Sequence, residues 1–193
     1  NAAAGRRFFG TTVDAELEFQ GRKDQLRLSY NEDPKTVNDA LTEDSGLPPG
    51  IPGNPTDIDP SAPGITDEVY VRKRFRLFHM HNFVRSDFWW TGLLENREYQ
   101  ESSDDERVLR FDANWVWRLG VVTSLNTSGS WQERDLRDAN NDYKLWYARI
   151  GVTREFGSTS SAELDYQFSD RDGDNDNNDY SENRISARLL FSF

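Results

Sequence analysis

Apolar and polar residues alternate one by one along most of this chain. Between residues 109 and 119 the apolar positions are Leu109, Phe111, Ala113, Trp115, Trp117 and Leu119, and the positions between them are Arg110, Asp112, Asn114, Val116 and Arg118. A repeat of two residues predicts a β-strand with one apolar and one polar face. The apolar row covers 11 residues, about the length that a tilted strand needs to cross a bilayer.

Similar segments recur along the whole chain, and no helical period of comparable length appears. The nine segments are residues 9–20, 25–30, 69–84, 88–99, 109–119, 123–132, 146–153, 161–168 and 184–193. The third and fourth are less regular, because Lys73, His79 and His81 fall on the face of Phe75 and Leu77. We expect a bulge or a change of phase there.

The connections between the segments alternate in length. Residues 21–24, 85–87, 119–121 and 157–159 form short connections, whereas residues 33–67, 101–106, 135–142 and 170–179 form longer ones. Short turns on one side and long polar loops on the other are typical of outer-membrane barrels. The strands of a soluble sandwich or barrel also alternate apolar and polar residues, but such a protein has no reason to place its short connections at one end and its long ones at the other. The sequence therefore predicts an all-β, antiparallel, up-and-down transmembrane β-barrel, with about nine strands in this chain.

The composition limits the alternatives. The mean hydropathy is −0.85 and the apolar runs are short, which excludes a spanning helix but not a barrel, since only every second barrel residue faces lipid. The net charge of −11 argues against nucleic-acid binding. The chain has no Cys, so disulfide and thiolate chemistry are excluded, and we expect no cofactor. Its first residues contain no initiator Met and no secretory signal, as expected of a mature, processed or partial chain.

The polar faces of the segments carry charges of both signs. We expect the following to line a lumen: Arg27, Arg72, Arg74, Arg76, Arg110, Asp112, Arg149, Glu163, Asp165, Arg184 and Arg188, together with Asp14, Glu16, Glu18 and Glu182. If these residues line water, they set the selectivity for ions or saccharides. If they pair with one another, they fill the interior. In a soluble β protein the same face would be solvated.

The ends of the chain bear on barrel closure. Ile185, Ala187, Leu189, Phe191 and Phe193 form an apolar row that resembles the C-terminal signal read by the barrel-assembly machinery, although Arg188 stands where Gly is frequent. With Phe193 on the periplasmic side, nine segments place the first one starting outside, whereas single-chain barrels have an even strand number. We therefore expect residues 1–193 to be the C-terminal part of one larger barrel domain. Its further strands would come from upstream sequence or from another chain, since open edges are costly in lipid.

Two loops and a histidine pair invite other interpretations. All seven Pro lie between residues 33 and 67, so we expect a long extracellular loop that is not a central strand. Asp172, Asp174 and Asp176 surround Gly173 at a spacing that suits calcium. The EF-hand pattern is incomplete there, and the alternatives are a solvated acidic loop or divalent ions bridging to lipopolysaccharide.

His79 and His81 fall near the periplasmic end, away from the outer rim where a catalytic cleft would lie. We therefore expect no enzyme activity.

Part of the chain resembles a known family. The motifs are "EVYVRKRFRLFHMHNFVRSDFWWTGLLENREYQ" and, after a strand and a tight turn, "SGSWQERD". Over residues 65–193 they resemble outer-membrane proteins associated with the exosortase/PEP-CTERM system, whose members are longer than this chain. The resemblance implies a role in exopolysaccharide production or export and supplies no site residues. We expect a porin-like channel or export pore in the bacterial outer membrane, in contact with lipid and lipopolysaccharide. The alternative is a structural barrel that anchors or sheathes a partner complex.

Overall fold

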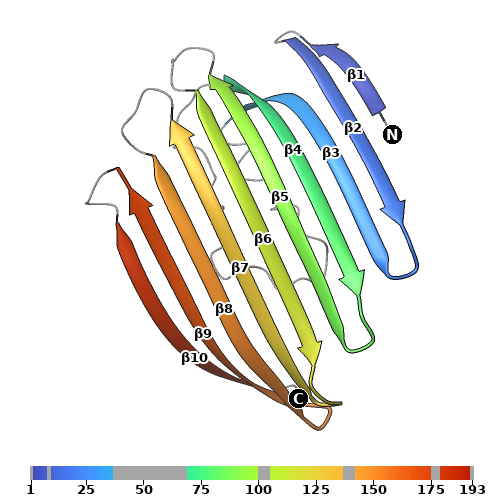
Figure 1. The fold of residues 1–193 in the computed structure, drawn as a ribbon, viewed down its shortest axis with the longest axis vertical. Helices are drawn as coiled ribbons and strands as arrows, with labels where there is room; N and C mark the ends of the chain where they lie inside the picture. The colour runs from blue at the N-terminus through green and yellow to red at the C-terminus, as the bar shows by residue number, and fades with distance from the viewer. Residues whose placement is uncertain are drawn as a thin grey trace.

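The computed structural model describes residues 2–7, 10–36, 69–99, 105–136, 142–174 and 179–191, with side chains from residue 12 on, except at 35 and 36. Within these residues ten strands form one antiparallel sheet in chain order (Figure 1). They are β1 (Ala2–Arg7), β2 (Gly10–Gln20), β3 (Asp24–Thr36), β4 (Val69–Asn82), β5 (Ser86–Tyr99), β6 (Glu106–Arg118), β7 (Thr123–Leu136), β8 (Tyr143–Phe156), β9 (Ser160–Gly173) and β10 (Tyr180–Phe191). No helix that could cross a membrane occurs in the described part of the chain.

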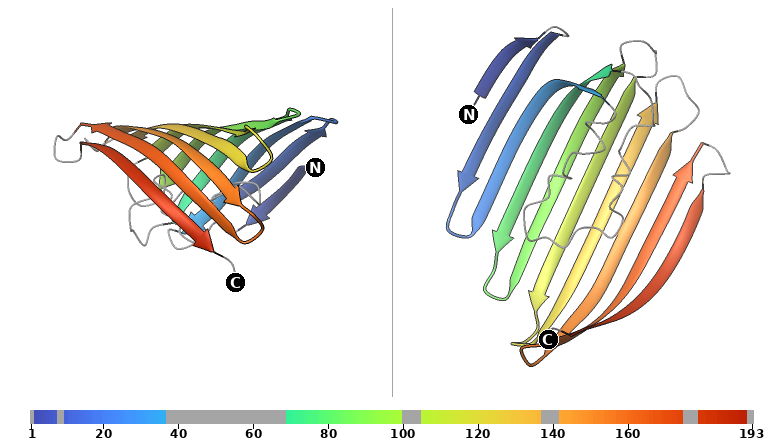
Figure 2. Two further views of the ribbon diagram at one scale, coloured as in Figure 1. Left: turned by 90° about the horizontal axis from the view of Figure 1, so that it is seen from below. Right: turned by 180° about the vertical axis from the view of Figure 1, so that it is seen from behind.

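The predicted up-and-down topology is confirmed. The nine expected segments correspond to β2–β10, and each described strand pairs only with its neighbours in the sequence. Figure 2 shows the sheet curved into an open trough, with β1 and β10 at its two edges. We call its two rims the tight-turn end, where β2 meets β3 and β8 meets β9, and the long-connection end. Gly157 at a tight turn has a φ of +74°, a conformation that favours glycine.

The structure adds β1, which the sequence did not predict. Ala2 pairs with Ala15 and Arg7 with Gly10, so β1 runs antiparallel to β2 toward the long-connection end. The sequence AAAGRR has no apolar–polar alternation, which explains why β1 was missed. The expected first segment, β2, is therefore not the first strand, and the described strands number ten instead of about nine. The open sheet itself agrees with the prediction: among the described strands β10 pairs with β9 alone.

The expected bulge in the third segment is wrong. The β3–β4 register runs without interruption from Asp24↔His81 to Thr36↔Val69, and the β4–β5 register is equally continuous. Lys73 lies toward the long-connection end of β4, and His79 and His81 lie toward the tight-turn end. Polar residues close the apolar row at both ends, so no change of phase is needed.

The strands are longer than their apolar rows, which corrects the expected long connections. β3 continues to Thr36 and β9 to Gly173, because the hydrogen-bonded ladder continues where both faces become polar. Pro34 pairs with Val71 inside β3. The last β2–β3 pair is Val13↔Glu32, so Pro34 lies where β3 has a free edge and needs no donor. The rest of the expected loop, residues 37–67, lies outside the described residues.

The two faces of the sheet are opposite in character to those of a soluble protein. The convex face exposes apolar side chains, with Phe111 45% and Ile150 47% exposed. The concave face buries charged ones, with Arg97 and Glu106 each 2% exposed. Soluble proteins bury apolar groups and expose charges. The opposite arrangement here indicates that the convex face of the sheet lies against apolar surroundings.

Candidate functional site: the concave polar face

The concave polar face is formed by the polar rows of β2–β10. The register brings the expected lumen residues to this one face, since Arg27 pairs with Glu18 and Phe78, and Gln167 pairs with Arg149 and Arg184. The expected residues found on it are Asp14, Glu16, Glu18, Arg27, Arg72, Arg74, Arg76, Arg110, Asp112, Arg149, Glu163, Asp165, Glu182, Arg184 and Arg188. A strand repeat of two residues is sufficient to place them together.

Near the long-connection end, charges of alternating sign form a buried network across β4–β7. Arg97 donates to the Glu95 carboxylate at 2.5 Å and to the Glu106 carboxylate at 2.9 Å. Arg74 forms an ion pair with Glu95, and Arg134 forms one with Glu106. Each carboxylate is therefore shared by two guanidinium groups, an arrangement that offsets the cost of removing the charges from water.

Aromatic side chains surround this network. The Tyr99 hydroxyl donates to Glu106 at 3.3 Å, and the ring of Tyr70 lies 5.4 Å from that of Tyr99. On β8 the Tyr143 hydroxyl accepts from Gln132 at 3.0 Å, and the Arg171 guanidinium lies 4.1 Å from the Tyr143 ring. Buried charged and aromatic side chains thus occupy the long-connection end of the concave face.

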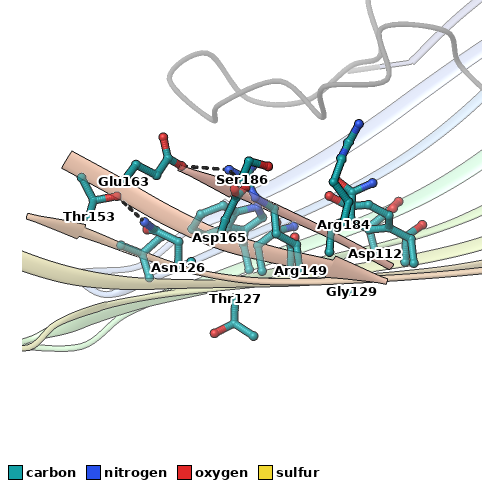
Figure 3. Close-up of a pocket in the computed structure, with 18 of the residues that line it drawn as sticks. Asp112, Asn126, Thr127, Gly129, Arg149, Thr153, Glu163, Asp165, Arg184 and Ser186 are labelled. Carbon is teal, nitrogen blue, oxygen red and sulfur yellow. Dashed lines mark hydrogen bonds and ion pairs between the residues drawn. The ribbon is translucent and has the colours of Figure 1, made fainter. Parts of the chain in front are cut away.

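Toward β10 the concave polar face opens into a pocket of about 530 Å³. Figure 3 shows Asn126, Arg149, Thr153 and Glu163 on the same side of the sheet, with Thr127 on the other. Arg149 contacts Glu163 at 2.8 Å and Asp165 at 2.6 Å, and Asn126 donates to Thr153 at 3.2 Å. Trp89 and Tyr147 add aromatic surface. The pocket thus offers planar polar groups and aromatic faces together.

Two arginines of β10 stand at the edge of this pocket. Arg184 donates to Gln167 at 2.7 Å, and Gln167 is 7% exposed. Arg188 approaches Glu163 only at 3.7 Å and is 65% exposed. Since Glu163 already contacts Arg149 at 2.8 Å, these cations can interact with a polar or anionic solute.

The buried network was missed by the sequence analysis. Glu95 and Arg97 share one face of an expected segment at a spacing of two residues, a pattern that was visible but not used. Glu106 and Arg134 fell in the expected connections or next to them. Their partnership depends on the registers Arg97↔Glu106 and Glu106↔Leu136, which no single segment reveals.

The other candidates are placed as follows. His79 and His81 lie on the convex face near Asp24. Asp172 is in β9 opposite Lys144, and Asp174 follows the strand. Asp176 lies outside the described residues, and within those that are described no group of three or more His, Asp or Glu side chains could hold a metal. Ile185, Ala187, Leu189 and Phe191 share one face of β10, and Phe193 lies outside the described residues.

Comparisons with known proteins identify the fold. No family model matches the chain, and no curated protein matches it significantly. Two solved structures of OmpT, an outer membrane protein of Vibrio cholerae, are similar. The loop L8 deletion mutant has a TM-score of 0.62 at 9% identity, over 94% of this chain and 54% of that one. OmpT expressed in the outer membrane has a TM-score of 0.56 at 9% identity, over 92% and 53%. This chain thus spans about half the length of these barrels.

The sequence-based exclusion of enzyme activity is overturned by this comparison. That exclusion rested on the position of His79 and His81, whereas the chain shares its fold with OmpT barrels. One fold can carry different activities. The position of two histidines in the sequence is therefore no ground for excluding every enzyme activity.

Topology, inverted faces and structural neighbours agree. The chain folds as part of an outer-membrane-type β-barrel.

Proposed function

We propose that this chain forms part of the wall of a porin-like channel in the bacterial outer membrane. In this proposal the convex face contacts lipid and the concave polar face lines a passage for polar solutes. The observation that carries it is the inversion of the two faces: apolar side chains such as Phe111 and Ile150 are exposed, while Glu95 and Arg97 are buried.

The convex face has the dimensions of a lipid-facing belt. On β7 the convex-face positions between Glu133 and Thr123 carry no charge, and this span of 10 residues corresponds to about 26 Å of bilayer for a strand tilted by about 40°. Trp131 and Trp146 lie 6.1 Å apart next to the long-connection end of this belt, and Trp115 and Trp117 stack at 5.4 Å near the tight-turn end. Aromatic residues at both borders are typical of membrane barrels.

The pocket supports transport of a hydrophilic solute. Its planar polar groups and its aromatic residues Trp89 and Tyr147 suit the hydroxyls and ring faces of a saccharide. The resemblance to proteins of the exosortase/PEP-CTERM system favours the same class of solute and makes an export pore for exopolysaccharide the specific form of this proposal.

A structural barrel is the second candidate, and the buried network favours it. Arg74, Glu95, Arg97, Glu106 and Arg134 form ion pairs with one another, so their charges at the long-connection end are directed at each other and not at a solute. A barrel with charges paired in this way would anchor or sheathe a partner complex.

The proposed channel needs more strands than this chain provides. The edges of β1 and β10 have no partner among the described strands, and unpaired backbone groups cost several kcal/mol each in hydrocarbon. We propose that upstream sequence or another chain completes the wall, in keeping with neighbours about twice as long.

Conductance in planar bilayers tests the proposed function. The protein extracted from membranes should give stepwise currents that diminish when a neutral oligosaccharide enters the passage. A protein that inserts, as judged by its resistance to unfolding in detergent, but gives no current would contradict the channel and support the structural barrel.

A further inference from the structure

A polar cluster interrupts the convex face near the tight-turn end. The His81 Nδ1 lies 2.5 Å from the Asp24 carboxylate, and the His79 Nε2 lies 3.5 Å from the same oxygen. Because a carboxylate only accepts hydrogen bonds, the His81 Nδ1 is the ring nitrogen that donates to Asp24. In a neutral imidazole the second nitrogen of this ring, Nε2, is an acceptor.

On the convex face, the apolar row is shorter at β4 than at β8. On β8 the charges at Lys144 and Arg154 are 10 residues apart, whereas on β4 Lys73 and His79 are six apart. With about 3.4 Å per residue and a tilt of about 40°, the apolar layer is about 26 Å deep at β8 and about 16 Å deep at β4. The belt is therefore shorter at β4, and we call the cluster of Asp24, His79 and His81 at its tight-turn border the notch.

The surroundings of the notch are those of a membrane interface. The His79 ring lies 6.0 Å from the Trp90 ring, and the His81 ring lies 4.3 Å from the Phe83 ring. Arg22 and Lys23 directly precede Asp24, and both are exposed. A carboxylate and two imidazoles thus stand next to two cations at one border of the apolar belt, where headgroups would meet acyl chains in a membrane.

We propose that this notch binds the headgroup of an ethanolamine phospholipid in the leaflet on the tight-turn side. The primary ammonium donates to Asp24 and to an imidazole nitrogen, and the phosphate interacts with Arg22 and Lys23. Trp90 packs against the part of the same lipid that lies next to the headgroup. The inference depends on the proposed membrane position of the convex face, and it does not depend on channel activity.

A headgroup fits the notch better than a second copy of the chain does. A two-fold interface between copies would match these charges only if the carboxylate of one copy lay opposite the cations of the other, which requires one fixed register of the two sheets. An ethanolamine headgroup carries one positive and one negative group and matches the notch in both signs.

Lipid exchange with defined vesicles tests the site. The protein from membranes is incubated with equal amounts of phosphatidylethanolamine and phosphatidylcholine, and the retained lipid is measured by native mass spectrometry. The two lipids share a phosphate, but choline has no N–H donor. We expect a preference of about three- to tenfold for the ethanolamine lipid, as expected of one charge-assisted hydrogen bond. Equal retention would overturn the proposal.

Matched variants localise the effect. Asp24→Asn should remove most of the preference, whereas Asp87→Asn, at the same end but on the concave polar face beside Arg118, should leave it unchanged. Loss of the preference in both variants, or in neither, would contradict the site. Free phosphoethanolamine should not compete, because the acyl chains contribute to binding. Competition would assign the notch to a soluble ligand and overturn the proposed lipid binding. A cross-linked dimer through β3 and β4 would assign the surface to a second copy.

A separate measurement distinguishes failure here from failure of the membrane position. Lipids with brominated acyl chains should quench the tryptophans of the convex face. Quenching without a preference for ethanolamine overturns the headgroup site alone. Absence of quenching overturns the membrane position of the convex face, and with it both proposals.

Discussion

Arg97 and Glu106 face each other across β5 and β6, with the guanidinium 2.9 Å from the carboxylate and both side chains almost fully buried. Removal of one partner from such a pair leaves a buried charge without compensation. Glu106→Gln should therefore lower the free energy of unfolding by about 3–5 kcal/mol. Urea unfolding of the protein in lipid vesicles, followed by tryptophan fluorescence, measures the change.

An exposed ion pair provides the control. Lys144 and Glu133 lie 3.4 Å apart, and both are substantially exposed, so Lys144→Gln should change the same free energy by no more than about 1 kcal/mol. Similar small effects of both substitutions would show that the network of Arg97 and Glu106 does not lie in a buried interior.

The convex face should not tolerate a charge at mid-bilayer. Ala113 on β6 and Ala148 on β8 belong to the exposed apolar rows of their strands. Replacement of either by Arg should cost about 2–4 kcal/mol of folding free energy in vesicles. Ser130→Arg on the concave polar face should cost clearly less. If all three variants insert and fold like the parent protein, the apolar rows are not in lipid.

The arginines of β10 should influence which ions pass. Arg184 and Arg188 border the pocket, where Arg184 donates to the neutral Gln167 and the ion pair of Arg188 with Glu163 is long, at 3.7 Å. The double change to Glu should raise the permeability of cations relative to anions by about twofold or more, because charged side chains set the ion preference of a pore. Reversal potentials in a salt gradient measure this ratio. An unchanged ratio, equal to that of Lys144→Gln on the convex face, would place the two arginines away from the ion path.

The strand pattern could be predicted from the sequence, but the ends of the strands and one whole strand could not. The row from Leu109 to Leu119 alternates because one face meets apolar surroundings, and that cause is local. β1 shows no such pattern in AAAGRR, and its presence follows only from pairing with β2. A bulge was expected at Lys73 and His79 because these polar residues fall in an apolar row. They lie at the two ends of that row, so the strand alternates without a bulge.

The sequence predicts which residues lie on the concave polar face, but not how their charges pair. Alternation assigns Arg110, Arg149 and Arg184 to the polar side without any tertiary information. It does not say which charges pair, because Arg97 meets Glu106 through the β5–β6 register and Arg134 reaches Glu106 through the β6–β7 register. Whether a charged face is filled or open therefore depends on long-range pairing.

The orientation in the membrane can be tested with single cysteines, since the chain has none of its own. Ser158 lies in the tight turn between β8 and β9, and Asp174 lies at the long-connection end. An impermeant thiol reagent added to intact cells should label Asp174→Cys and should leave Ser158→Cys unlabelled until the outer membrane is permeabilised. The reverse pattern would invert the assigned topology.

The alternation of environment along β8 tests the central claim most directly. Nitroxide labels are attached singly at positions 146–150, 152 and 153, with Gly151 omitted because a Cβ there would lie 3.1 Å from the Cβ of Asp165. In membranes, labels at Trp146, Ala148, Ile150 and Val152 should be relaxed mainly by oxygen, which concentrates in lipid. Labels at Tyr147, Arg149 and Thr153 should instead be relaxed more by a water-soluble nickel complex. A period of two in this ratio is the predicted result, and uniform access of the nickel complex to both sets would contradict a barrel wall between lipid and water.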